Sequence, residues 1–201
     1  FAAMDGASGT ALGNSTLENL VGDYTVGIGG EAGRYATGSF NTFVGFSAGK
    51  GGTTSAPFSS GQYGTAVGYQ AGYNAVGSGN TFIGLNAGRD QTTAGNNVIV
   101  GWDAGLKMTS GGSNVIIGVS AAVKATTMDT SVIIGDDAGS NITTAGNNTI
   151  IGRSAGDDLT TGGQNVIIGK LTDAGAGGRV GAVVLGYACA ASSNNALLIG
   201  Y

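Results

Sequence analysis

The sequence predicts an all-β fold: a parallel β-solenoid, or β-roll, of about twelve coils of 16–17 residues each. Two observations support this prediction. The stretch NNVIVGWDAG, from Asn96 to Gly105, recurs in near-copy as NNTIIGRSAG, from Asn147 to Gly156. Glycine supplies 41 of 201 residues, several times the ordinary share of about 7%, whereas proline occurs once. The single proline excludes collagen, and 41% hydrophobic residues with only 10% charged residues exclude a disordered chain.

Each repeat unit contains a glycine that directly follows an aliphatic residue. We call this glycine the anchor and number the other positions of the unit from it. The anchors are Gly13, Gly29, Gly45, Gly68, Gly84, Gly101, Gly118, Gly135, Gly152, Gly169, Gly186 and Gly200. They lie 16 or 17 residues apart, apart from one gap of 23 and a last gap of 14. Residues 1–201 are therefore predicted to form a single repeat array, with an inserted loop at residues 50–61 in the long gap.

A short strand is predicted just before each anchor. Three or four apolar residues rich in Val, Ile and Thr precede the glycine, a pattern typical of strands. Glycine at this frequency would cost a helix about 1 kcal/mol per residue. Glycine at the anchor and asparagine at the start of the unit suit tight corners. Stacked coils place each strand about 4.8 Å from its copy, which predicts a rod roughly 55 Å long.

The strands are apolar on both faces, which predicts an assembly of several chains. Alternate side chains of a strand point to opposite faces, so positions −3 and −1 share one face and position −2 lies on the other. A lone solenoid would then expose a larger apolar patch than monomers normally do. We therefore expect position −2 to form a core between chains. The residues of this predicted interchain core are Phe43, Phe82, Ile99, Ile116, Ile133, Ile150, Ile167, Val184 and Leu198.

The motifs GNNVIVGWDAG, SVIIGDDAG and NTFIGLNAG resemble the Gly-rich N-[TS]-x-[IV]-G-x-x-A-G repeats of bacteriophage tail-fibre proteins. They are also similar to repeats in the β-roll heads of trimeric autotransporter adhesins. The resemblance covers about Thr10 to Tyr201. It implies a left-handed parallel β-roll whose chains are intertwined or packed as a homotrimer. The chain departs from the adhesin heads in its longer unit and in the Ile or Phe at position −2, where those heads favour Ala.

Aromatic side chains at position +1 and in the inserted loop are candidates for contact with a cell-surface glycan or protein receptor. The alternative is that they cover joints between coils or grooves between chains. The candidate surface contacts are Phe46, Phe58, Tyr63, Tyr69, Trp102 and Tyr187.

Composition argues against most chemistry. The chain has no histidine and one cysteine, Cys189, which excludes a His-based triad and a thiolate metal cluster. The pairs Asp136/Asp137 and Asp157/Asp158 are interpreted as solvated turn acids rather than as Ca²⁺ ligands. We therefore predict no catalytic residues, no cofactor and no metal site. The net charge of −4 and the scattered Lys and Arg residues argue against binding to nucleic acid. The sequence contains no run of about 18 apolar residues, so membrane insertion is not predicted.

The leading functional prediction is a structural fibre protein, the rigid trimeric shaft of a phage tail fibre or other extracellular appendage, with or without a receptor contact. Its location would be extracellular, on a virion tail fibre or a cell surface. One alternative is the head of a bacterial surface adhesin. Another is the subunit of a head-to-tail filament, because neither terminal unit has a cap. A minor alternative is an ice-binding solenoid, suggested by Thr pairs that begin at Thr92, Thr126, Thr143 and Thr160.

Overall fold

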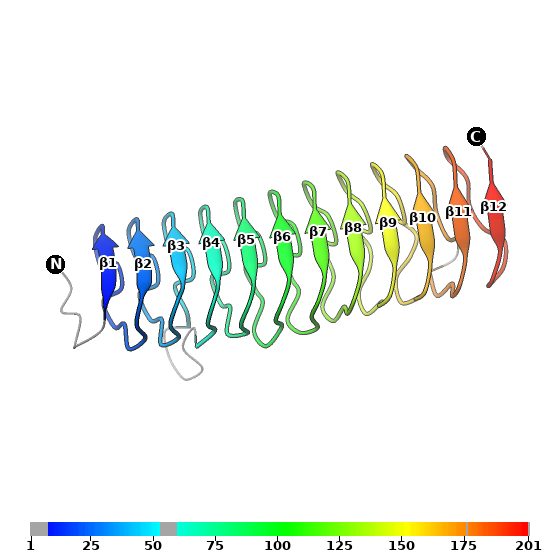
Figure 1. Ribbon diagram of the computed structural model, residues 1–201. Helices are drawn as coiled ribbons and strands as arrows, with labels where there is room; N and C mark the ends of the chain where they lie inside the picture. The colour runs from blue at the N-terminus through cyan, green and yellow to red at the C-terminus, as the bar shows by residue number, and fades with distance from the viewer. Residues whose placement is uncertain (1–7, 53–59, 176, 201) are drawn as a thin grey trace.

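The computed structural model describes residues 8–52, 60–175 and 177–200. Twelve short parallel strands lie side by side in one sheet, in the order of the sequence, and eleven turns of chain connect them (Figure 1). This confirms the predicted all-β parallel solenoid. No described residue lies in a helix, and thus no helix of this part of the chain is long and apolar enough to cross a bilayer. The strands are β1 (Gly9–Leu12), β2 (Thr25–Ile28), β3 (Thr42–Val44), β4 (Thr65–Val67), β5 (Thr81–Ile83), β6 (Val98–Val100), β7 (Val115–Ile117), β8 (Val132–Ile134), β9 (Thr149–Ile151), β10 (Val166–Ile168), β11 (Val183–Leu185) and β12 (Leu197–Ile199).

Each strand pairs with the equivalent residues of the next coil. Val98 of β6 lies beside Val115 of β7, and Thr42 of β3 lies beside Thr65 of β4. The second pair spans the long gap between anchors, so the extra residues of the 50–61 segment do not shift the register of the strands. Equal register along the whole sheet stacks equivalent positions of the repeat into straight columns.

The backbone requires glycine at the anchor. The anchors from Gly13 to Gly186 all have φ between +120° and +148°, a region that L side chains rarely adopt. The coils also approach closely there: a Cβ on Gly101 would lie 2.2 Å from the carbonyl oxygen of Gly118 in the next coil. The predicted tight corner is thus confirmed, and close stacking is a second reason for glycine.

Position −2 of each strand points into the coil rather than toward a neighbouring chain. Of the nine residues predicted to form an interchain core, eight are buried within the single chain, and Leu198 is partly buried against the same core. The eight buried residues are Phe43, Phe82, Ile99, Ile116, Ile133, Ile150, Ile167 and Val184. The assignment of these residues to a contact between chains was wrong, because an enclosed side chain has no surface left for a partner.

The Ala-Gly pair that follows most anchors explains why the coil closes on this face. Ala104 is fully buried, and a Cβ on Gly105 would lie 3.1 Å from Cδ1 of Ile99. A Cβ on Gly49 would lie 2.1 Å from the ring of Phe43. Small residues on one wall of the coil therefore make room for the large strand side chain from the other wall. Burying each Ile or Phe contributes about 1.5–3 kcal/mol.

Asparagine at position −4 forms a buried ladder along the rod. The Oδ1 atom of Asn97 accepts hydrogen bonds from the backbone N–H and the Nδ2 of Asn114, both at 2.9 Å. The Nδ2 of Asn114 also donates to the carbonyl oxygen of Met128, at 2.6 Å. The left-handed corner that the sequence suggested for asparagine is the preceding position, −5, where Asn96 has φ +58°. The two asparagines of the NN motif thus do different work, one at a corner and one in the ladder.

Candidate interaction surface

The outer face of the sheet is uncharged and mostly apolar over its whole length. It consists of positions −3 and −1, which alternate with the buried position −2 and are half-buried or exposed in every strand. Position −3 holds Thr10, Val26, Thr42, Thr65, Thr81, Val98, Val115, Val132, Thr149, Val166, Val183 and Leu197. Position −1 holds Leu12, Ile28, Val44, Val67, Ile83, Val100, Ile117, Ile134, Ile151, Ile168, Leu185 and Ile199. We call these two columns the outer sheet face. It contains no charged residue, unlike most surfaces that a monomer exposes to water.

The +1 column runs along one edge of the outer sheet face. Its aromatic candidates Phe46, Tyr69, Trp102 and Tyr187 are all exposed. Phe46 stacks on Tyr69 of the next coil, with ring centroids 5.8 Å apart. A Cβ on Gly30 would lie 3.2 Å from the Phe46 ring, so this ring also covers the preceding coil. These contacts support the joint-covering alternative for Phe46, and receptor contact by the column stays a prediction.

Position −5, at the opposite end of the strands, holds a second aromatic column. Tyr63, predicted from the loop, belongs to it and is exposed. Tyr24 and Phe40 occupy the same position in the two preceding coils, and both were missed in the sequence. Each lies five residues before its anchor, as Asn96 does, so the repeat frame contained the signal. Phe58, the remaining candidate surface contact, lies outside the described residues, as does Pro57.

The acidic pairs have ordinary structural partners. Asp136 lies 3.5 Å from Nε of Arg153. The Oδ1 of Asp157 accepts hydrogen bonds from Oγ of Ser140 and from Nδ2 of Asn141. In the part of the chain that the structure describes, no group of three or more possible ligand side chains could hold a metal ion. The side chains of Asp136 and Asp157 thus contact residues of a neighbouring coil.

The pKa shifts of two carboxyl groups also have structural causes. The hydrogen bond that Lys50 donates to Glu31, at 2.7 Å, holds the pKa of this carboxyl below its usual value. Arg34 bonds the other oxygen of Glu31 at 2.9 Å. Burial raises the pKa of Asp173, although its oxygens accept backbone hydrogen bonds from Asp158 and Gly175. Hydrogen bonds to neighbouring side chains account for the first shift and burial for the second.

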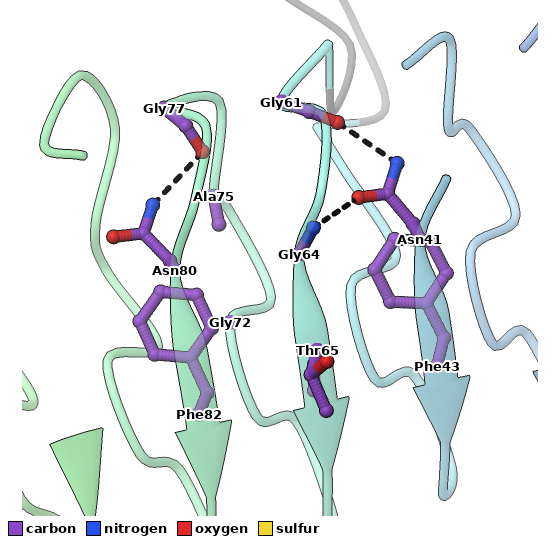
Figure 2. A pocket seen from close by; sticks show the side chains of 11 residues that line it. Asn41, Phe43, Gly61, Gly64, Thr65, Gly72, Ala75, Gly77, Asn80 and Phe82 are labelled. Atoms are coloured by element: carbon purple, nitrogen blue, oxygen red, sulfur yellow. Dashed lines mark hydrogen bonds between the residues drawn. The ribbon is translucent and has the colours of Figure 1, made fainter. Parts of the chain in front are cut away.

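A small cavity in the core lies behind β4, where the repeat departs from its pattern. Figure 2 shows Phe43 and Phe82 on the flanking strands, with Gly64 between them at position −4, where six other coils have the ladder asparagine. Asn41 bridges the gap by accepting from the Gly64 N–H at 2.7 Å and donating to the Gly61 carbonyl at 2.8 Å. The cavity measures about 20 Å³, which is room for about one water molecule.

No family model, curated protein or solved structure that was compared with the chain matches it. The resemblance to tail-fibre and adhesin-head repeats therefore stays a prediction from the motif. The surface of the chain combines a mostly apolar outer sheet face with aromatic residues at some positions of the two adjoining columns.

Proposed function

We propose that the chain is a structural fibre protein, a rigid extracellular shaft in which three copies pack through their outer sheet faces. The observation that supports this proposal is the uncharged surface formed on all twelve strands by aliphatic residues at position −1 and by aliphatic residues or Thr at position −3. Position −2, which was expected to contact neighbouring chains, instead fills the inside of the coil. The outer sheet face, at positions −3 and −1, is therefore the surface available to a partner.

The size of the outer sheet face supports assembly. Twelve strands spaced about 4.8 Å apart, each three residues wide, cover roughly 550 Å². Soluble monomers rarely expose contiguous apolar patches above a few hundred Å². With its two edge columns, the face approaches the roughly 800 Å² that each partner buries in a standard interface. Threonine and β-branched aliphatic side chains present a flat, regular surface to a second copy.

The mechanical role follows from the backbone. Every strand is bonded in register to the next, and the turns add coil-to-coil bonds such as Gly118 N–H to the Val100 carbonyl, at 2.8 Å. A buried asparagine ladder runs parallel to these bonds. Bending the rod would stretch several columns of hydrogen bonds at once, so the shaft resists bending and local unfolding.

We expect the double variant Ile117→Lys/Ile134→Lys to separate the chains without unfolding them. The two side chains are neighbours on the outer sheet face of β7 and β8, and two buried charges in an apolar interface would cost several kcal/mol. Mass photometry across a dilution series should give three times 19.5 kDa for the natural chain and 19.5 kDa for the variant. The circular dichroism spectra should agree.

The control is Thr127→Lys, which places one such charge on an exposed position away from the outer sheet face. It should remain a trimer. A natural chain that is monomeric at all concentrations would reject the assembly. A mass that grows with concentration would instead favour the head-to-tail filament, in which β1 and β12 pair end to end.

One observation favours the ice-binding alternative as a second candidate. Thr109 and Ser110 occupy the equivalent positions in the coil between the pairs that begin at Thr92 and Thr126. Five successive coils therefore have Thr followed by Thr or Ser, which forms two adjacent columns. In the first column each Oγ1 donates to the carbonyl of the next coil at 2.9–3.1 Å. This holds methyl and hydroxyl groups at regular spacing, which suits ordered water.

If the two Thr columns bind ice, the natural chain should show thermal hysteresis. Thr127→Tyr, in the second column at the middle of the array, should abolish it. The bulky ring would interrupt the flat surface while leaving the Thr126 hydrogen bond in place. Absence of hysteresis in the natural chain rejects this candidate and leaves the fibre proposal intact.

A further inference from the structure

The aromatic column at position −5 occupies a backbone conformation that favours small residues. All described residues of this column from Tyr24 onward have φ between +50° and +73°. Eight coils place Gly, Asn, Ser, Thr or Gln there: Gly79, Asn96, Ser113, Thr130, Asn147, Gln164, Gly181 and Asn195. Three successive coils instead have Tyr24, Phe40 and Tyr63, with φ +54°, +62° and +58°.

These three aromatic residues are not needed to form the corner. The same corner forms with small or amide residues in eight other coils, and a bulky residue in the left-handed region costs of order 1–3 kcal/mol. Each of the two stacked ring pairs offsets only about 0.5–1.5 kcal/mol of this conformational cost. Strain that the fold does not require points to a use of the rings outside the fold.

The three rings form one exposed, ordered ladder. Tyr24 and Phe40 stack with centroids 5.3 Å apart and planes 13° apart, and Phe40 and Tyr63 with centroids 5.2 Å apart and planes 5° apart. Their exposed fractions are 65%, 47% and 65%. The next member of the column, Gly79, has no side chain to continue the stack. The ladder is thus a defined patch in the segments just before β2, β3 and β4, and not a general property of the repeat.

A polar column accompanies the rings at position −6. Asp23, Ser39 and Gln62 directly precede the three aromatic residues. The Oγ of Ser39 accepts a hydrogen bond from the Asp23 N–H at 3.0 Å, and Oδ1 of Asp23 accepts one from the Ser8 N–H at 3.2 Å. Asp23 and Gln62 are exposed. Each of the three coils thus presents an aromatic ring beside a short polar side chain.

We propose that Tyr24, Phe40 and Tyr63 form a binding site for a linear neutral polysaccharide. Because the rings stack on one another, they offer their outward edges and the outer face of Tyr63, beside Gly79, to the C–H groups of pyranose rings. Carboxylate, hydroxyl and amide groups bond the sugar hydroxyls. A repeating ladder on an open surface fits a polymer of similar repeating units better than a single small molecule, which favours an enclosed pocket. Asp23 is the one charged residue among the six, so the site offers little to an ionic polymer.

The proposal goes beyond the shaft function and does not require the trimer. The test is a calorimetric titration of the full chain with hexasaccharides of glucose (α- and β-linked), mannose, galactose and N-acetylglucosamine. We expect binding to at least one of them. The triple variant Tyr24→Asn/Phe40→Asn/Tyr63→Asn should bind it at least tenfold more weakly. Asparagine is the residue that Asn96, Asn147 and Asn195 place at this corner, so the variant should melt no lower than the natural chain and keep its particle mass.

Two controls show whether the three rings themselves hold the ligand. Leu171→Asn removes an exposed apolar residue that also has a positive φ, far along the rod from the ladder, and should leave the affinity unchanged. Raising the salt from about 0.05 M to about 0.5 M should also leave it unchanged, because a neutral ligand is not held by screened charges. Failure of the natural chain to bind any of the hexasaccharides, or equal binding by the triple variant, would overturn the proposal. If the chain does not form a trimer, the particle mass shows this independently of the sugar titration.

Discussion

Replacing Gly118 by Ala is expected to break the stack in the middle of the rod. Gly118 has φ +141°, and a Cβ there would lie 2.2 Å from the carbonyl oxygen of Gly135 in the next coil. The obstacle is backbone, so no side-chain rotation can relieve it. We expect a loss of at least about 3 kcal/mol in the free energy of unfolding, from backbone strain and steric overlap together.

Chemical denaturation followed by circular dichroism measures this effect. Because each coil contacts only its neighbours, the damage should divide the array, and a second unfolding transition is expected. Gly178→Ala is the matched control: its φ is not in the left-handed region, and its Cβ would meet only Oγ1 of Thr161, at 3.6 Å. This variant should stay within about 0.5 kcal/mol of the natural chain. Equal stability of the two variants would show that the anchor column tolerates a side chain.

Replacing Asn114 by Ala is expected to have the second largest effect. Its Nδ2 donates to Oδ1 of Asn97 and to the carbonyl of Met128, and its Oδ1 accepts from the Ser131 N–H at 2.9 Å. Alanine would leave the buried Met128 carbonyl and Ser131 N–H without these partners. Each buried unsatisfied group costs about 1–3 kcal/mol, so we expect a loss of roughly 2–5 kcal/mol.

Asn114→Ser tests the role of the ladder directly. Ser131 already replaces asparagine in this column, and its Oγ accepts from the Asn148 N–H at 3.1 Å. A serine at position 114 should therefore recover part of the stability lost in the alanine variant, as measured by the midpoint of thermal unfolding. If the serine and alanine variants melt together, the cost comes from lost volume rather than from the ladder.

The repeat frame was predictable because it depends on local backbone needs. An aliphatic residue before glycine recurs at 16 or 17 residues, and both the strands and the corner glycines occur where that spacing puts them. The register even continues past the 23-residue gap between Gly45 and Gly68. Asparagine was assigned to a corner, which is correct for position −5. Its ladder role at −4 depends on the neighbouring coil, which places one amide against the next.

The candidate contacts were predicted only in part. Position +1 stood out because its residues vary, and its aromatic members are exposed. Tyr63 stood out because it lies next to the inserted loop, whereas Tyr24 and Phe40 have no such neighbour in the sequence and were missed. Stacking of these rings is a contact between coils, visible only when position −5 is compared along the column.

By itself, the sequence determined the fold class, the positions of the strands and the need for glycine at each corner, because these follow from periodicity and backbone conformation. Only the tertiary structure decided which face of the strand is inside. Alternation separates Ile116 from Val115 and Ile117, but all three are apolar, so hydrophobicity could not choose between the faces. The choice depends on the opposite wall of the coil, where Ala121 and its equivalents leave room for the large side chain at position −2. Packing across the coil therefore encloses Ile116 and leaves the columns of Val115 and Ile117, at positions −3 and −1, as the outer sheet face.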